Sequence, residues 1–255
     1  PMCTTLPDSL EVLEKSKEHG GLVWIGLEYR YMSPIQSLIK HIEEIGDIRM
    51  LSIREHRFPF LEKVDNWNRF NENTGGTLVE KCCHFFDLMN LIVPSKPIKV
   101  YASGGQDVNH LDEKYDGKTP DIIDNSFVIV DYQDGQRAML DLCMFAEAGK
   151  YEQEIVLTGD QGKLETHIPG NELLLTNRKN YSLKTIEVKD DPRVKEVGFH
   201  HGASYIEHLE LIDCIKNKKK PLVDCQKGLD SIILGLAAQE SIQTGAPVFL
   251  ENFLN

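Results

Sequence analysis

Gly75-Gly76-Thr77-Leu78-Val79-Glu80-Lys81-Cys82-Cys83-His84-Phe85-Phe86-Asp87-Leu88 is the stretch that decides how this chain folds and where its chemistry lies. Two glycines lead directly into a predicted helix over residues 77–93, which ends before Pro94. Glu80, His84 and Asp87 recur at helical spacing, so we expect their side chains on one face. The residues between them are mostly apolar and predict an opposite face buried in a core. A carboxylate and an imidazole one turn apart are suited to proton transfer.

The same three side chains allow two other interpretations. In a structural one, Glu80 favours the positive end of the helix dipole, and His84 is a half-buried histidine bonded to Asp87. In a metal-site interpretation, the three side chains supply oxygen and nitrogen ligands. The sequence offers no second ligand cluster to complete such a site, so we expect no metal. Spacing alone does not decide between proton transfer and a structural role.

Length and composition describe an ordinary globular protein. The chain has 255 residues, of which 41% are hydrophobic and 27% are charged, enough for a sizeable core. Its 40 acidic residues exceed its 28 basic residues and give a formal net charge of −12. An acidic surface repels phosphate groups, so we expect neither nucleic acid nor an anionic membrane as a partner.

The six cysteines are scattered and form no Cys-x-x-Cys pair. In a chain of this length, they are typical of the reduced, mostly buried thiols of an intracellular protein. The sequence contains no signal peptide and no apolar run of about 18 residues. We therefore expect a cytoplasmic protein.

The chain begins with an α/β pattern. Residues 8–19 predict a helix that ends at a glycine pair, and residues 22–27 follow as an apolar run. A run without polar alternation predicts a strand buried on both faces, as in a parallel sheet. A helix leading into such a strand is typical of the end of an α/β unit. The chain begins at Pro1 rather than at a methionine, so we expect the rest of this unit upstream.

The remainder of the chain is rich in strands. Alternating patterns and turn signals predict strands at residues 47–58, 98–103, 125–132, 136–145, 151–158, 162–167, 172–175 and 184–188. Further helices are expected at residues 33–45, 203–216 and 226–244, the last capped by Asp224 and Gly245. Consecutive hairpins build an antiparallel sheet. The predicted fold class is α+β, an open, largely antiparallel sheet flanked by helices.

Two loops carry further residues suited to ligand binding. Tyr29-Arg30-Tyr31 follows the predicted strand 22–27, and ligands gather at the ends of parallel strands. His200 and His201 lie between glycines just before a helix, where the backbone can approach a ligand closely. The alternative for residues 29–31 is a packed aromatic pair with an ion-paired arginine. The alternative for His200 and His201 is an ordinary solvated loop. The sequence has neither Gly-x-Gly-x-x-Gly nor the P-loop pattern, so no dinucleotide site of those types is expected in it.

The ordered set of these motifs resembles the Gfo/Idh/MocA family of NAD(P)-dependent oxidoreductases. Pro1 resembles the proline of the family's Glu-Lys-Pro motif, and residues 29–34 resemble its Arg-aromatic-x-Pro segment. Residues 75–87 resemble its Gly-Gly…Asp-xxx-His-xx-Asp helix, with Glu80 in place of the aspartate. The resemblance covers nearly the whole chain.

This resemblance implies a two-domain enzyme. Residues 1–27 would be the last helix and strand of a dinucleotide-binding Rossmann domain, and residues 28–255 the substrate-binding and oligomerisation domain. The cofactor-binding residues and a catalytic lysine are expected upstream of Pro1, so the chain as given should be inactive by itself. The implied reaction is hydride transfer between NAD or NADP and a secondary alcohol of a polyol, an inositol or a sugar. A glycoside-cleaving relative and a non-catalytic binding or scaffolding module are the alternatives.

The resemblance also implies roles for single residues. His84 would be the catalytic proton shuttle, and Glu80 would orient it. The expected substrate-binding residues are Lys81, Arg30, Trp67, His201 and Tyr205. We further expect a homodimer or higher homo-oligomer, formed through the apolar sheet face that carries Phe127, Ile129 and either Met139 or Leu140.

Overall fold

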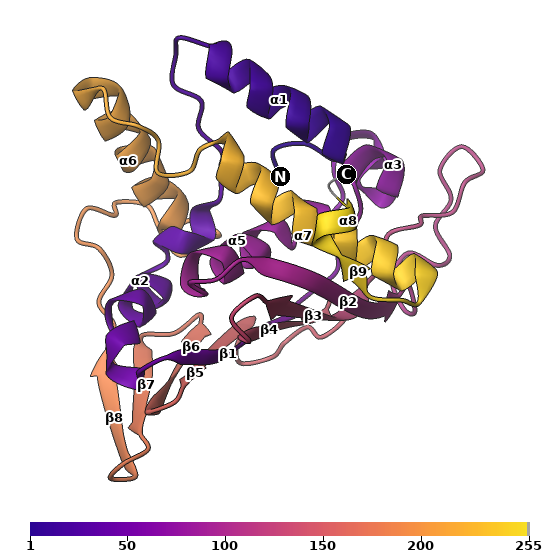
Figure 1. Cartoon of the computed structure of the whole chain (residues 1–255). Helices are drawn as coiled ribbons and strands as arrows, with labels where there is room; N and C mark the ends of the chain where they lie inside the picture. Colours follow the sequence, from indigo (N-terminus) through magenta and orange to yellow (C-terminus); the bar gives the residue numbers. More distant parts are fainter. Residues whose placement is uncertain (254–255) are drawn as a thin grey trace.

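An open nine-stranded sheet with helices over one face forms the body of the molecule (Figure 1). This computed structural model describes residues 1–253. The strands lie in the order β8-β7-β6-β5-β1-β4-β3-β2-β9, and only β1 and β4 run parallel among the paired strands of this described part. The predicted α+β class with a largely antiparallel open sheet is confirmed.

Strands β1 to β8 agree closely with the alternation and turn signals of the sequence, whereas the helix predicted at residues 33–45 is divided into α2 and the 3₁₀ helix η2. The strands are β1 Ile48–His56, β2 Pro97–Gly105, β3 Asn125–Tyr132, β4 Arg137–Cys143, β5 Gln153–Gly159, β6 Gly162–Ile168, β7 Glu172–Asn177, β8 Ser182–Glu187 and β9 Val248–Phe249. The α-helices are α1 Leu6–Glu18, α2 Ser33–Lys40, α3 Asn71–Thr74, α4 Thr77–Glu80, α5 Cys83–Ile92, α6 Ala203–Asn217, α7 Cys225–Thr244 and α8 Leu250–Phe253. Short 3₁₀ helices span η1 Glu28–Tyr31, η2 Ile42–Ile45 and η3 Val64–Arg69.

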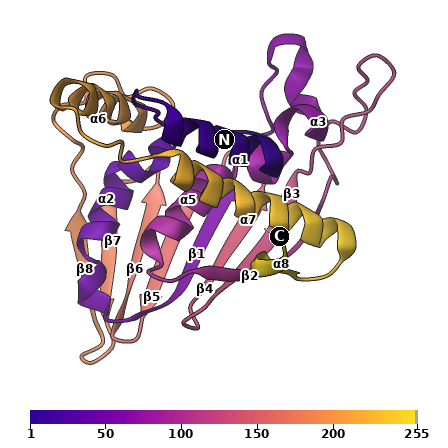
Figure 2. The same cartoon turned by 45° about the horizontal axis from the view of Figure 1, so that its top comes forward.

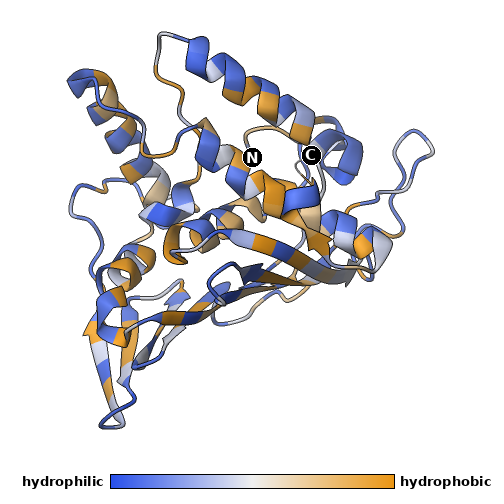
Figure 3. Ribbon diagram, viewed as in Figure 1, coloured by the Kyte–Doolittle hydropathy of each residue, from blue (hydrophilic) through white to orange (hydrophobic). Residues whose placement is uncertain are grey.

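The core lies between the sheet and the helices α5 and α7. Alternate residues of the central strands, such as Val128 and Val130 of β3, are fully buried against this helix layer. Figure 2 shows α7 crossing above the sheet with α1 outside it. Figure 3 shows α1 as largely hydrophilic on its outer side, whereas hydrophobic residues recur along α5 and α7. Gly235 of α7 permits a close approach to α4, because a Cβ at this position would lie 2.5 Å from the carbonyl oxygen of Leu78.

The helix predicted at residues 77–93 is interrupted. The carbonyl oxygen of Thr77 accepts hydrogen bonds from the amides of both Lys81 and Cys82, at 3.0 and 3.2 Å, so the helical ladder slips by one residue. The helix therefore divides into α4 and α5. As a result, Glu80 and His84 no longer belong to one regular helical face, and the i, i+4 argument does not hold across the break.

The strand predicted at residues 22–27 is wrong. A strand requires a neighbouring ladder, and among residues 1–253 the only main-chain bond from these residues to another segment joins the amide of Ile25 to the carbonyl of Val223, at 3.0 Å. Residues 22–25 are half-buried rather than enclosed on both sides. The segment instead leads as extended chain into η1, and this turn presents Glu28 and Tyr29 to the interior.

Candidate functional site

Four side chains from three distant segments meet beside the start of α5. The Nδ1 atom of His84 lies 3.6 Å from a carboxylate oxygen of Glu28, and the other oxygen lies 3.5 Å from Nε2 of His200. The ring of Tyr29 stacks on His84, with 4.8 Å between centroids and 21° between planes. It also contacts His200 at 5.9 Å. We call Glu28, Tyr29, His84 and His200 the histidine cluster.

His84 is held as a neutral imidazole. Burial lowers its pKa well below 6.5, and the positive charge of Lys81 acts in the same direction, as does His200. Its Nδ1 atom is buried without a hydrogen-bond partner, while 16% of the side chain remains exposed. A neutral, partly accessible imidazole can accept a proton from a ligand.

Glu28 is the member of the histidine cluster that the sequence did not indicate as a candidate site residue. Its carboxyl group is buried at the first residue of η1, and burial raises its pKa above 4.5 despite the positive charge of Lys81. Only one signal was available, an acidic residue directly after an apolar run. The spacing rules could not relate Glu28 to His84, because 56 residues of chain separate them.

Lys81 is anchored beneath the histidine cluster. Its ammonium group donates to the Tyr29 hydroxyl at 2.6 Å and pairs with Glu55 of β1 at 3.1 Å. Glu55 is fully buried and also accepts from the amide of Gln153 at 2.5 Å. The lysine therefore fixes Tyr29 and contributes charge, and with 9% of its surface exposed it has little room for a direct ligand contact.

Glu80 lies in a different set of contacts. Its carboxylate pairs with Lys63 at 2.8 Å, and the Lys63 ammonium lies 4.9 Å from the ring centroid of Trp67. Among the ion pairs of residues 1–253, none joins Glu80 to His84. Trp67 is 40% exposed on η3, so this group offers an aromatic face beside a charged pair.

Arg30 lies outside the histidine cluster, buried in an ion pair with Asp87. Its Nε and Nη2 atoms donate to the two carboxylate oxygens at 2.9 and 2.5 Å. This bidentate pair joins η1 to α5 and leaves the guanidinium little capacity for a substrate.

His201 directly follows His200 in the chain, and Tyr205 lies in the first turn of α6. Both are half-buried, and His201 adopts a left-handed backbone conformation with φ of 50°. In the described part of the chain, no hydrogen bond, ion pair or ring contact joins either of them to the cluster.

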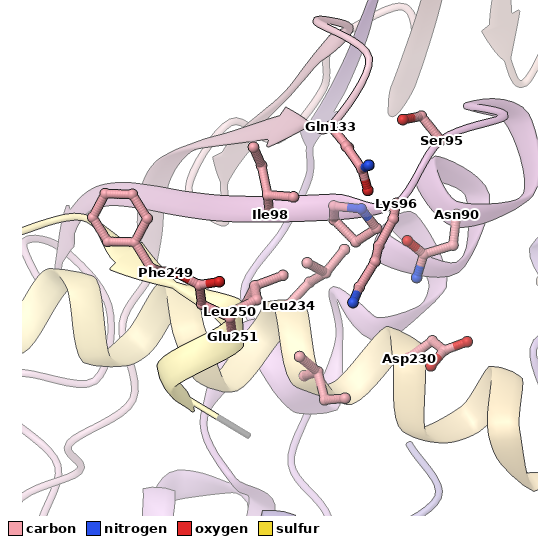
Figure 4. Close-up of a pocket in the computed structure, with 12 residues that line it drawn as sticks. Asn90, Ser95, Lys96, Ile98, Gln133, Asp230, Leu234, Phe249, Leu250 and Glu251 are labelled. Atoms are coloured by element: carbon pink, nitrogen blue, oxygen red, sulfur yellow. The ribbon is translucent and has the colours of Figure 1, made fainter. Parts of the chain in front are cut away.

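A separate cavity of about 610 Å³ lies between the end of α5, the start of β2 and the helices α7 and α8 (Figure 4). Asn90, Lys96 and Asp230 provide part of its polar lining, and Phe249 part of its apolar lining. It contains no member of the histidine cluster, so the two features are distinct.

Residues 1–253 contain no group of three or more His, Cys, Asp or Glu side chains arranged to hold a metal ion. None of the helices in this part is both long and apolar enough to cross a bilayer. No glycine-rich turn links a strand to a helix N-terminus in these residues, so they do not fit the pyrophosphate of a dinucleotide.

Disrupting the pair between Arg30 and Asp87 should destabilise the fold strongly. We expect Asp87→Ala to lower the free energy of unfolding by about 3–5 kcal/mol, because the guanidinium remains buried without its partner. Urea denaturation followed by circular dichroism measures this. The double variant Arg30→Met with Asp87→Met should recover part of the loss. A loss below about 1 kcal/mol for Asp87→Ala would contradict the role given to this pair.

His84 should also make stability depend on pH. Its pKa is lower in the folded chain than in the unfolded chain, so the unfolded state binds more protons below pH about 6.5. Stability from the neutral ring is therefore present above this pH and is lost as pH falls. The difference in unfolding free energy between the wild type and His84→Gln should decrease on acidification, by up to about 1.4 kcal/mol per pH unit. A pH-independent difference would contradict burial of the neutral imidazole.

Comparison with known proteins agrees with this architecture. Residues 39–250 match the family model described as "Oxidoreductase family, C-terminal alpha/beta domain". The myo-inositol 2-dehydrogenase of Thermotoga maritima is 24% identical over 260 residues, covering 100% of this chain and 72% of that protein.

Two solved structures illustrate the likeness in fold. An oxidoreductase from Agrobacterium radiobacter in complex with NAD+, L-tartaric acid and magnesium has a TM-score of 0.79 at 16% identity, over 99% of this chain and 72% of that one. The aldose-aldose oxidoreductase of Caulobacter crescentus complexed with glycerol has a TM-score of 0.77 at 16% identity, over 98% of this chain and 70% of that one. Because the family model matches most of the sequence, the chain belongs to the Gfo/Idh/MocA oxidoreductase family, with the C-terminal α/β domain of that family.

Proposed function

We propose that this chain is the substrate-binding part of an enzyme that transfers a hydride between NAD(P) and a secondary alcohol of a polyol, an inositol or a sugar. The observation that carries the proposal is a neutral, partly accessible His84 packed between Glu28 and Tyr29, in a member of an oxidoreductase family. The names of the similar proteins support the substrate class. One relative is a myo-inositol 2-dehydrogenase, and two proteins of similar fold were solved in complex with tartaric acid and with glycerol.

The proposed chemistry assigns proton transfer to His84. A bound NAD(P) would supply the hydride acceptor for the carbon that carries the hydroxyl group. His84 takes the hydroxyl proton on Nε2, because Nδ1 faces Glu28. Glu28 takes the orienting role that the sequence assigned to Glu80. Glu80 with its partner Lys63 instead borders the substrate space beside Trp67.

The remaining substrate contacts are proposed from position. Trp67 offers an exposed aromatic face, on which the C–H groups of a sugar or inositol ring can pack. His201, just before α6, and Tyr205, in the first turn of α6, provide further polar groups. Lys81 acts through Tyr29 and through its charge, since both Tyr29 and Glu55 already hold its ammonium group.

The division into domains is likewise a proposal. Residues 1–27 would belong with a dinucleotide-binding domain and residues 28–255 with the substrate domain, and the family match over residues 39–250 lies within the second of these. Because the described residues do not fit a pyrophosphate, the chain alone should show no dehydrogenase activity. A cytoplasmic location stays a prediction from the cysteine content.

The test is oxidation of a panel of polyols, inositols and sugars by the protein joined to its dinucleotide-binding domain. His84→Ala should lower kcat by about 10²–10⁴-fold with little change in the free energy of unfolding, because it removes the proton acceptor. Appearance of NADH or NADPH absorbance measures the rate. The control is His208→Ala, which removes an exposed imidazole from α6. An unchanged kcat for His84→Ala would exclude the histidine from the mechanism, and binding without turnover by the wild type would favour a non-catalytic module.

We also propose that the uncovered sheet face forms a homo-oligomer. Tyr101, Ile129 and Met139 lie opposite one another on β2, β3 and β4, and Phe127 lies beside them. All four are between 37% and 60% exposed, whereas Leu140 is fully buried. A contiguous apolar face of this kind is typical of a protein interface.

Phe127→Glu should convert the oligomer to a monomer at micromolar concentration, because it places a charge in the centre of the proposed interface. Static light scattering measures the mass. The matched control is Val108→Glu, which adds the same charge at a 54% exposed loop position. We expect the wild-type interface to bury more than about 1,000 Å². A monomeric wild type would contradict this proposal.

A further inference from the structure

The carboxyl group of Glu28 lies between two histidines that differ in their access to solvent. One oxygen faces His84 Nδ1 at 3.6 Å and the other faces His200 Nε2 at 3.5 Å. We propose that Glu28 and His200 form a relay that carries the proton accepted by His84 out to solvent. This inference rests on the proposed function, because it assumes that His84 receives a proton during turnover.

The exposure of the three groups gives the relay a direction. The side chains of His84 and Glu28 are only 16% and 11% exposed, whereas His200 is 42% exposed. The second ring nitrogen of His200, Nδ1, lies 3.0 Å from the hydroxyl oxygen of Ser204 at the start of α6. The groups thus lead from the buried imidazole to the surface in two steps.

The spacing suits a mobile carboxyl group better than a static ion pair. Both nitrogen–oxygen distances exceed a normal hydrogen bond by about 0.5 Å, and His84 Nδ1 is buried without a partner. The relay requires a side-chain rotation that brings the carboxyl group within hydrogen-bond distance of one ring at a time. Tyr29 contacts both rings and keeps them on either side of the carboxyl group.

The proton count closes without any other reactant. His84 Nε2 binds the hydroxyl proton of the alcohol, and Nδ1 releases a proton to the Glu28 carboxylate. The resulting carboxylic acid gives its proton to His200 Nε2, and His200 Nδ1 releases one to solvent. Glu28 is then again a carboxylate, and each ring carries its proton on Nε2 instead of Nδ1, so a return of the two rings to their first tautomers completes the cycle.

The surroundings bring the proton affinities of the three groups toward one another. Burial raises the pKa of Glu28 and lowers the pKa of both histidines. When the pKa values of neighbouring groups are similar, no group holds the proton so tightly that the next transfer becomes slow.

Several other charged groups act on the relay. Lys81 lowers the pKa of both Glu28 and His84. Lys81, Arg57 and His201 act on His200 in the same direction. Glu207 of α6 repels the Glu28 carboxylate, and the two acids raise the cost of ionising one another.

Chemical rescue distinguishes a relay from a structural role. In the protein joined to its dinucleotide-binding domain, His200→Ala should lower kcat by about 10-fold or more in dilute buffer. Added imidazole should restore kcat in this variant, because it replaces the lost proton acceptor at a solvent-exposed position. His208→Ala, in the neighbouring helix, should show neither the loss nor the rescue. A loss that imidazole does not restore, or no loss at all, would overturn the relay.

Glu28→Gln tests the central step. The amide keeps the shape of the side chain but cannot carry a proton, so kcat should fall by about 10–100-fold while KM changes by less than about 2-fold. A rise in KM with kcat unchanged would show that Glu28 binds substrate instead of relaying protons.

A measurement without turnover separates this inference from the proposed function. Nuclear magnetic resonance can follow the titration of His84 and His200 in the 255-residue chain, with His208 as an internal reference. If the carboxyl group couples the two rings, Glu28→Gln should shift both midpoints to lower pH and leave His208 unchanged. Independent titrations would overturn the relay even in an active enzyme. Coupled titrations in a protein that oxidises no alcohol would refute the proposed function and leave the coupling intact.

Discussion

The buried ion pair between Arg30 and Asp87 is the interaction on which the histidine cluster depends. It joins η1 to α5 through two hydrogen bonds in a region that excludes water. Glu28 and Tyr29 precede Arg30 directly, and His84 lies one turn before Asp87. Fixing the pair therefore also fixes the carboxyl group and the aromatic ring against the imidazole. A pair of this kind is costly to bury, but its geometry specifies one relative placement of two short segments.

The slip in the helical ladder at Lys81 and Cys82 determines which acid serves His84. In a continuous helix, Glu80 would lie one turn before the histidine on the same face. The break instead lets Lys81 reach down to Glu55 in the sheet, while Glu80 pairs with Lys63 on the loop after β1. Lys81 thus anchors the histidine cluster on the side of the sheet, and the neighbouring Glu80 lies on its outer side. The same loop brings Trp67 beside that outer pair.

Burial shapes the electrostatics of the cluster more than net charge does. The chain carries a formal charge of −12, yet the largest influence on the pKa of Glu28, His84 and His200 is removal from water. Lys81 adds a fixed positive charge that keeps His84 neutral. An acid that is harder to ionise and two histidines that are harder to protonate form a set that can exchange protons near neutral pH.

Local sequence alone determined most of the sheet and its class. Strand alternation predicted β1 to β8, the turns after residues 132 and 159 predicted the hairpins β3-β4 and β5-β6, and Asp224 and Gly245 placed the ends of α7, because these signals act within a few residues. The insertion of β1 between β4 and β5, parallel to β4, was not predicted. The place of His84 in a proton-transfer site stays a prediction from its motif. The tertiary structure decided its acidic partner, the pairing of Arg30, the break in the helix and the absence of a strand at residues 22–27. Each of these depends on which group lies opposite in space, and neither periodicity nor spacing along the chain contains that information.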